Sequence, residues 1–262
     1  MLLPGVDRTM SKLPALRRRL DTEAAYHDCT FAHPERDKVY SLPIPPIVDG
    51  YIQTLLCNVQ DKRIIEIGCG TGGNLLRLAS KGAYVWGVDI SQEAINRCRE
   101  LVSDGPLASR IHLSVGDAHR LKFPDAFADI IVGNAILHHL ELEVACGELY
   151  RCLRPGGRAV FLEPLGHNPF INLFRMLTPH RRTPTERPLK WSDIDLLSRK
   201  FRVSHKEFFC LPIVAFVPGI LGMPRVFRWG FSFLYRIEKM LKIDRLLRKY
   251  SWITVLELHK EI

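Results

Sequence analysis

Residues 64–73 read IIEIGCGTGG, an apolar run that leads directly into four closely spaced glycines. Glycines at this spacing are typical of a turn where the backbone approaches a ligand, because a Cβ would fill the ligand's volume or forbid the required dihedral angles. The run 63–67 predicts a strand, and residues 73–80 predict a helix. The stretch therefore predicts a strand, a glycine loop and a helix that together hold a ligand.

The same rhythm of β-rich runs and helical patterns continues along the chain. The expected strands are 63–67, 84–89, 111–115, 130–133, 158–163, 201–209 and 252–258. The expected helices are 73–80, 91–103 with Ser91 as its N-cap, 142–153 and 192–198. This alternation predicts an α/β fold, a doubly wound, Rossmann-like sheet of seven mostly parallel strands, with a helical insertion before the last strand.

Two regions depart from this rhythm. Residues 1–60 hold several prolines and one helical pattern, 48–59, so we expect an N-terminal leader with lid helices, with a disordered leader an equal alternative for the first twenty residues. Residues 61–262 form the main domain. Within it we expect a substrate-side loop at 164–200 and a basic amphipathic insertion at 210–250.

Cysteine usage and the N-terminus bear on the cell compartment. The 7 cysteines are scattered and no two form a C-x-x-C pair, which argues against a disulfide framework and a zinc site. We therefore expect no metal, and a reducing, cytoplasmic setting. The first twenty residues lack the apolar stretch of about 7 to 15 residues that a secretory signal needs.

The net charge of +9 is concentrated near the C-terminus, because residues 171–250 hold 17 Lys or Arg against 6 Asp or Glu. Residues 208–223 are uncharged, but this stretch is too short to span a bilayer, which takes about 20 apolar residues. Residues 225–250 place apolar residues at helical spacing among basic ones. This pattern is typical both of a helix that packs its apolar face on the domain and of contact of 208–250 with an anionic membrane surface, and a lid over a lipophilic substrate is compatible with either.

Glu66 distinguishes between two classes of cofactor. The glycine spacing also satisfies G-x-G-x-x-G, and Asp89 at the end of the next strand could bind a ribose in a dinucleotide site. An acidic residue at position 66 repels phosphates, however, and suits a cationic ligand. S-adenosylmethionine carries an ammonium and a sulfonium group, so Glu66 favours it over a dinucleotide.

Four motifs together resemble those of class I S-adenosylmethionine-dependent methyltransferases, in particular the small-molecule branch of that family. They are Glu66-x-Gly68-x-Gly70-x-Gly72, Asp89, Gly116-Asp117-Ala118 and Leu153-Arg154-Pro155-Gly156-Gly157, and they cover residues 60–165 in the family's order and spacing. The resemblance implies S-adenosylmethionine as the cofactor.

The resemblance also implies a role for each cofactor-binding residue. Glu66 and the loop with Gly68, Gly70 and Gly72 would hold the methionine part of the cofactor, and Asp89 the two ribose hydroxyls. Ile90 would pack on the adenine, Asp117 and Ala118 would bind its amino edge, and Asn134 would lie beside the methionine end.

The acceptor is expected near NAILHHL, residues 134–140, because ligands of such sheets bind at the carboxyl ends of the strands. His138 and His139 are the catalytic candidates, since a histidine can take a proton from a phenol, an enol or a hydroxyl near neutral pH. The alternative is that one histidine packs against or caps the following helix while the other faces solvent.

The expected function is methyl transfer to a small, lipophilic organic acceptor, with oxygen the favoured atom. Two alternatives stay open. A nucleic-acid methyltransferase would use the basic C-terminal region, but nucleic acid is disfavoured as a partner because no Asn/Asp-Pro-Pro-aromatic tetrapeptide follows the fourth strand. A non-catalytic accessory protein is disfavoured by the intact Glu66, glycine loop and Asp89, although fold alone proves no reaction.

Overall fold

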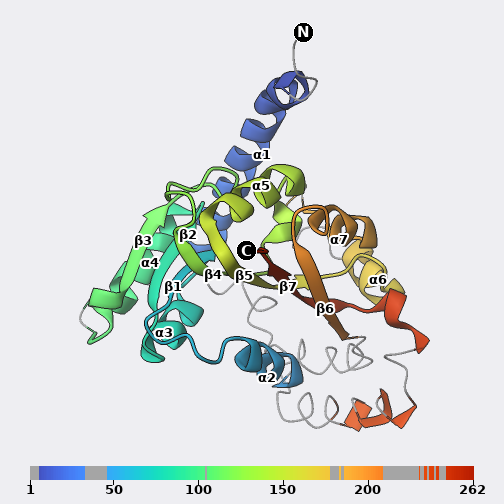
Figure 1. Cartoon of the computed structure of the whole chain (residues 1–262). Coiled ribbons are helices and arrows are strands. Elements are labelled where there is room, and N and C mark those ends of the chain that lie inside the picture. Colours follow the sequence, from blue (N-terminus) through green and yellow to red (C-terminus); the bar gives the residue numbers. More distant parts are fainter. Residues whose placement is uncertain are drawn as a thin grey trace.

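The computed structural model describes residues 6–32, 46–103, 105–177, 183, 186–208, 230, 233–234, 236–238, 240–241 and 246–262. Its centre is one seven-stranded sheet with the order β3-β2-β1-β4-β5-β7-β6 (Figure 1). The strands are β1 (Arg63–Ile67), β2 (Tyr84–Asp89), β3 (Ile111–Val115), β4 (Ala128–Asn134), β5 (Leu153–Pro164), β6 (Arg202–Phe208) and β7 (Ile253–His259). Strands β1 to β5 pair in parallel and β7 runs antiparallel to both its neighbours, which confirms the predicted fold class.

Helices cover both faces of the sheet (Figure 1). One apolar cluster joins Ile64 of β1 to Leu75 and Ile95 of the helices on the first face, and a second cluster joins Ile65 to Leu149 on the other. The first face carries α2 (Pro46–Leu55), α3 (Gly73–Ser80) and α4 (Gln92–Val102), and the second carries α5 (Leu142–Cys152) and α7 (Trp191–Leu197). Because both faces are covered, the central strands are apolar on both sides, as parallel sheets require.

Lid helices were expected within residues 1–60, but only the pattern at 48–59 located one, so the place and length of α1 (Val6–Ala32) were not predicted; α6 (Pro169–Leu177) was not predicted at all. The first part of α1 extends away from the body of the molecule (Figure 1). Near the other end of α1, Asp28 Oδ1 accepts hydrogen bonds from Ser91 Oγ at 2.5 Å and from the Glu93 amide at 3.1 Å. The same Ser91 hydroxyl accepts from the Ala94 amide at 3.0 Å, which confirms Ser91 as the N-cap of α4. Helix α1 is therefore attached to the start of α4.

Some predicted boundaries shift. Strand β5 begins at Leu153 rather than at residue 158, because Leu153 already pairs with Ala128 of β4. The helical pattern at 48–59 becomes α2, which ends at Leu55. The described residues also form short 3₁₀ helices, which are η2 (Ala108–Arg110), η3 (Leu137–His139) and η6 (Arg248–Tyr250). The predicted insertion at 210–250 falls mostly outside the described residues.

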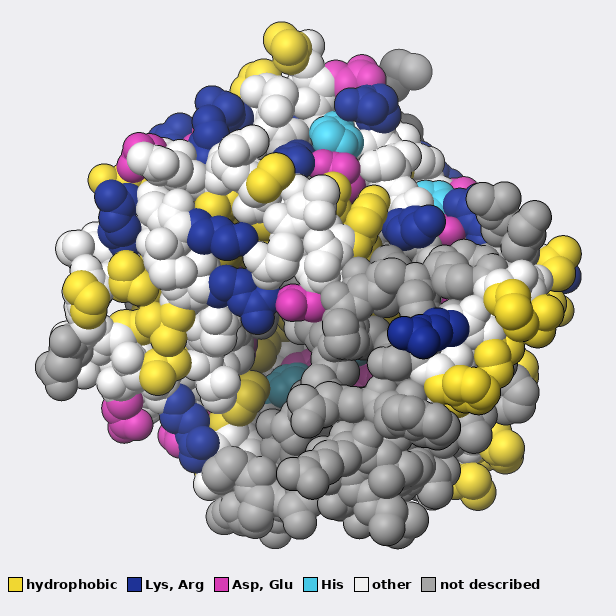
Figure 2. Space-filling model, turned by 90° about the horizontal axis from the view of Figure 1, so that it is seen from below, with side chains coloured by type: hydrophobic (Ala, Val, Ile, Leu, Met, Phe, Trp, Pro, Cys, Tyr) yellow, Lys and Arg dark blue, Asp and Glu magenta, His cyan; other side chains and the backbone are white. Residues whose placement is uncertain are grey.

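Basic side chains are dispersed over the described part of the face in Figure 2. Figure 2 shows Lys and Arg singly or in small groups between neutral and hydrophobic side chains, with acidic side chains among them. No helix within the described ranges is both long enough and apolar enough to cross a bilayer. The local excess of positive charge that the sequence shows at 171–250 thus forms no single patch among the described residues on this face.

Substitution of two adjacent glycines tests the conformation of the loop before α3. Gly72 has φ +87°, and a Cβ there would lie 2.9 Å from Cys98 Sγ, whereas a Cβ at Gly73 would meet no atom within 4 Å. A left-handed conformation costs an L-residue about 1–2 kcal/mol. We therefore predict that Gly72→Ala loses at least about 1 kcal/mol of unfolding free energy in urea titrations followed by circular dichroism.

Gly73→Ala is the matched control, and it should be neutral or up to about 1 kcal/mol more stable, since alanine is the better helix former. Equal losses in the two variants would contradict this description of the loop.

Candidate active site

The glycine loop after β1 needs glycine for two separate reasons. Gly68, Gly70 and Gly72 have φ values of +64°, +51° and +87°, in the left-handed region. A Cβ on Gly68 would also lie 2.9 Å from Ile136 Cδ1 and one on Gly72 2.9 Å from Cys98 Sγ, whereas one on Gly70 would only make an ordinary contact, at 3.6 Å, with the ring of Phe31 in α1. The loop thus packs closely between the segment after β4 and helix α1.

Asp89, the last residue of β2, fixes this loop. Its Oδ2 accepts a hydrogen bond from the Gly70 amide at 2.8 Å, and its Oδ1 accepts from the Ser91 amide at 2.9 Å. The side chain is buried, which raises the pKa of Asp89, and the bonds from Ser91 and Gly70 offset part of this rise. A carboxylate has about four acceptor positions, so these two bonds leave capacity for the hydroxyls of a ribose.

Glu66 lies within β1 and is only 2% exposed. Burial raises the pKa of Glu66 to about 8; a hydrogen bond from Asn74 lowers it, and the negative charge of Asp89 raises it further. Among the described residues, Glu66 Oε2 has no hydrogen-bond partner. A buried polar atom without a partner is unfavourable, so this position is suited to an ammonium group. The residues present therefore fit a cationic cofactor.

The residues predicted to surround the adenine lie at the ends of β2 and β3. Ile90 follows β2 and is half-buried, and Ala118 is buried. Asp117 Oδ1 accepts from the amide of His119 at 2.8 Å and contacts His119 Nδ1 at 2.6 Å. His119 Nε2 in turn accepts from the Glu141 amide at 2.8 Å, which places the ring proton on Nδ1. Sequence reasoning missed His119.

The bonds from His119 affect the titration of Asp117. Burial raises the pKa of Asp117, but the hydrogen bonds and charge of His119 outweigh this effect and hold the pKa below its ordinary value. Asp117 is thus ionised at neutral pH, and its hydrogen bonds with His119 stabilise the loop that contains both residues.

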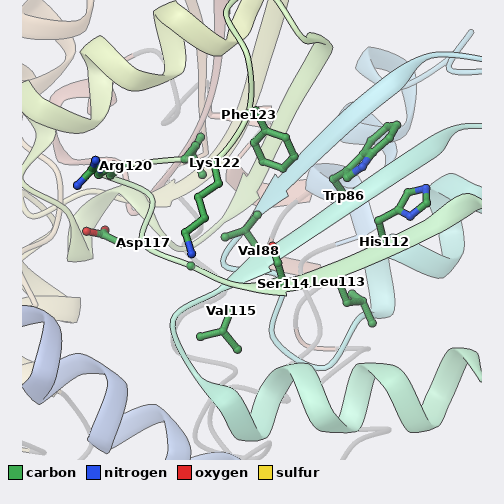
Figure 3. Close-up of a pocket in the computed structure, with 12 residues that line it drawn as sticks. Trp86, Val88, His112, Leu113, Ser114, Val115, Asp117, Arg120, Lys122 and Phe123 are labelled. Carbon is green, nitrogen blue, oxygen red and sulfur yellow. The ribbon is translucent and has the colours of Figure 1, made fainter.

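A cavity of about 280 Å³ borders Asp117 on the sheet side. Figure 3 shows Asp117 and Arg120 at one end, Trp86 and His112 at the other, and Lys122 between them. This cavity lies on the outer strands β2 and β3 and does not include His138 or His139. It is therefore separate from the position expected for the acceptor.

Asn134 is the last residue of β4, and the two histidines follow this strand. Strand β4 lies next to β1 in the sheet. Asn134 is exposed at the end of the strand, and Ala135 after it has a φ of +53°. His138 and His139 are both buried, with 6% and 8% exposure, so neither faces solvent. Their ring centroids lie 4.2 Å apart.

Glu163 orients His138. This carboxylate is fully buried at the carboxyl end of β5, and its Oε1 accepts from the amides of Ile136 and Leu137 at 2.8 and 2.7 Å. Its Oε2 lies 2.8 Å from His138 Nδ1. The carboxylate accepts the Nδ1 proton, which leaves Nε2 of His138 as the nitrogen that can accept another. Sequence reasoning placed Glu163 at a strand end but did not predict this pair.

His139 is held by helix α1 instead. Its Nδ1 lies 3.0 Å from Glu23 Oε2, and its ring packs edge-on against His27 at 5.4 Å between centroids. Burial lowers the pKa of His139, and the neighbouring carboxylate of Glu23 offsets part of this effect. Glu23 and His27 were missed from the sequence, although their spacing of four residues places them on one helix face.

Comparison with known proteins follows the same part of the chain. The family described as "Methyltransferase domain" matches residues 65–161, which contain the glycine loop and both histidines. Demethylmenaquinone methyltransferase of Symbiobacterium thermophilum is 35% identical over 116 residues, which are 43% of this chain and 45% of that protein. O-methyltransferase cnsE of Penicillium expansum is 30% identical over 116 residues, 44% of this chain and 42% of that protein. The matched region thus spans less than half the length of these curated relatives.

The solved structures extend the likeness to most of the chain. Geranyl diphosphate C-methyltransferase from Streptomyces coelicolor, solved with Mg²⁺, geranyl diphosphate and S-adenosyl-L-homocysteine, superposes with a TM-score of 0.62 at 13% identity. The superposition covers 83% of this chain and 79% of that one. At this identity the likeness shows a shared fold.

The raised pKa of Glu66 predicts a pH dependence of stability. The folded pKa of about 8 exceeds the ordinary 4.5, so the unfolded chain ionises first as pH rises and the folded state keeps its proton. The stabilisation from Glu66 is therefore present below pH 4.5 and is lost as pH rises towards about 8. We predict that the ligand-free protein loses unfolding free energy over this range relative to Glu66→Gln, measured by urea denaturation at several pH values. Parallel pH profiles of the two proteins would show that Glu66 does not retain its proton.

Proposed function

We propose that this chain, of which residues 65–161 match the methyltransferase-domain family, transfers the methyl group of S-adenosylmethionine to a small organic acceptor. The observation that carries this proposal is the carboxylate of Glu66, buried beside the glycine loop. Its Oε2, without a hydrogen-bond partner among the described residues, suits the ammonium group of this cofactor and is unfavourable for a pyrophosphate.

The remaining cofactor contacts follow from the positions of the strand ends. The backbone of Gly68, Gly70 and Gly72 would approach the methionine part, since their φ values and lack of a Cβ leave room there. Asp89 would accept from the ribose hydroxyls. Ile90, Asp117 and Ala118 would surround the adenine, and Asn134 would lie beside the methionine end.

When bound, S-adenosylmethionine supplies an electrophilic methyl group for an in-line displacement. The residues of this chain position the acceptor, and the rate gained from alignment at about 3 Å is large. His138, oriented by Glu163, suits the role of a general base for an acceptor that must lose a proton. His139 is less suited to that role, because its Nδ1 already faces Glu23.

We further propose that the acceptor is lipophilic and that oxygen is the favoured atom. Large apolar side chains are exposed on α6, where Leu173, Met176 and Leu177 are 51%, 70% and 69% exposed. Phe233 and Met240, before β7, are 50% and 73% exposed. These side chains would contact a lipophilic acceptor or the lipid phase that delivers it. The Penicillium relative is named as an O-methyltransferase, which supports oxygen, and the Symbiobacterium relative is named for the acceptor demethylmenaquinone, which supports a lipophilic acceptor.

The membrane contact of residues 208–250 stays a prediction, because most of these residues lie outside the part of the chain that the structure describes. Nucleic acid is disfavoured as a partner for the reasons found in the sequence, and the dispersed basic side chains in Figure 2 do not favour it.

Methyl transfer to an acceptor panel tests the proposal. The protein is incubated with methyl-labelled S-adenosylmethionine and lipophilic phenols or hydroxy acids, and products are identified by mass spectrometry. We expect at least one labelled product whose formation stops when the protein is omitted. Binding of the cofactor without transfer to any acceptor, RNA and DNA included, would instead support a non-catalytic accessory protein.

His138→Gln tests the general base. We expect kcat for a phenolic acceptor to fall by about 10²- to 10⁴-fold with little change in the KM for the cofactor, because only the proton acceptor is removed. His112→Gln, which changes an exposed histidine on β3, should retain the wild-type rate. An unchanged kcat in His138→Gln would exclude this histidine as the base.

A further inference from the structure

Three side chains that bind metals well converge beside the proposed base. Glu23 and His27 lie one helical turn apart on α1, and His139 comes from η3 after β4. One ligand atom from each lies within 4.8 Å of the other two. Glu23 and His139 are buried and His27 is half-buried, so the cluster is not an accidental grouping on an exposed surface.

The distances in this cluster match ligands around one ion. Glu23 Oε2 lies 3.0 Å from His139 Nδ1 and 3.6 Å from His27 Nε2. For Zn²⁺ with ligands at 2.0–2.2 Å, tetrahedral geometry separates neighbouring ligand atoms by about 3.4 Å. His139 Nδ1 and Glu23 Oε2 face each other at a separation that two ligands of one ion also adopt.

The carboxylate of Glu23 is also held from behind. Thr183 Oγ1 donates to Glu23 Oε1 at 2.9 Å, and both side chains are buried. This bond turns Oε2 towards the two histidines. Metal-binding carboxylates are commonly fixed by such outer hydrogen bonds, which orient the ligand before the ion arrives.

We propose that Glu23, His27 and His139 form a binding site for a divalent transition-metal ion of the Zn²⁺ type. Two imidazoles and one carboxylate suit Zn²⁺, Fe²⁺ or Co²⁺, whereas Mg²⁺ prefers oxygen ligands alone. Three protein ligands leave a coordination position open. This proposal replaces the expectation of no metal. That expectation rested on the spacing of the cysteines, which does not reveal ligands from two distant segments such as α1 and η3.

The open position has a chemical use in the proposed reaction. The rings of His138 and His139 are 4.2 Å apart, so the proposed metal site and the proposed base are neighbours. A metal-bound hydroxyl loses its proton more readily, which would assist methylation at oxygen. This role rests on the proposed function, whereas metal binding itself does not.

Co²⁺ titration of the whole chain, freed of metal by a chelator, tests the site. We expect one Co²⁺ per chain, with visible absorption bands typical of nitrogen and oxygen ligands, and displacement by Zn²⁺. His27→Gln and Glu23→Gln should each weaken binding by more than about 100-fold. Thr183→Val, which removes only the outer hydrogen bond, should weaken it by about 10- to 100-fold.

His112→Gln is the matched control, since it removes an exposed histidine outside the cluster, and it should bind Co²⁺ as the wild type does. Binding of S-adenosylhomocysteine, measured on the same samples, separates loss of the metal site from failure of the cofactor proposal. Thermal melting without metal shows whether each variant folds. If His27→Gln does not fold, the Co²⁺ affinities of the wild type and of Thr183→Val test the site instead. Absence of stoichiometric Co²⁺ or Zn²⁺ binding by the wild type, or wild-type affinity in a folded His27→Gln, would overturn the proposal.

Discussion

The carboxylate of Asp89 is the interaction on which the geometry of the site depends. At the end of β2 it accepts from Gly70 in the glycine loop and from Ser91 at the start of α4. Ser91 in turn donates its hydroxyl proton to Asp28 of α1. One buried acid thus links the cofactor loop to the helix that brings Glu23 and His27 to His139. The cofactor side and the acceptor side of the site are therefore coupled through a few hydrogen bonds at one strand end.

Electrostatics favours one class of ligand at this edge of the sheet. Burial raises the pKa of both Glu66 and Asp89, and the negative charge of Asp89 raises the pKa of Glu66 further. A cationic ligand relieves this repulsion, whereas a pyrophosphate would increase it. On the acceptor side, Glu163 and Glu23 each face a histidine, so the two adjacent histidines receive different partners and can take different roles. This difference separates a candidate base, His138, from a candidate metal ligand, His139.

The sequence predicted the sheet and the cofactor edge because their signals are local. Strands such as β1 are mostly apolar, and Glu66, the glycines and Asp89 fall at fixed positions relative to strand ends. The sequence indicated lid helices within residues 1–60 but did not locate α1, whose contacts are with segments far along the chain, among them Ser91 and Thr183. The pairing of Glu163 with His138 was missed for the same reason, since it joins the ends of two strands. Helix α1 is also only weakly amphipathic, so the spacing of its apolar residues does not indicate a helix clearly.

Calorimetric titration with S-adenosylhomocysteine, run beside Asp89→Ala and with NAD as the competing ligand class, tests whether this strand edge binds a methyl-donor cofactor. We expect micromolar binding of S-adenosylhomocysteine, no binding of NAD, and a loss of about 10- to 100-fold in Asp89→Ala, because charged hydrogen bonds to two hydroxyls are removed. Asp49→Ala, which changes a half-buried aspartate on α2 that pairs with Arg77, should bind as the wild type does. Binding of NAD in place of S-adenosylhomocysteine, or wild-type affinity in Asp89→Ala, would contradict the assignment of this strand edge to a cationic methyl-donor cofactor.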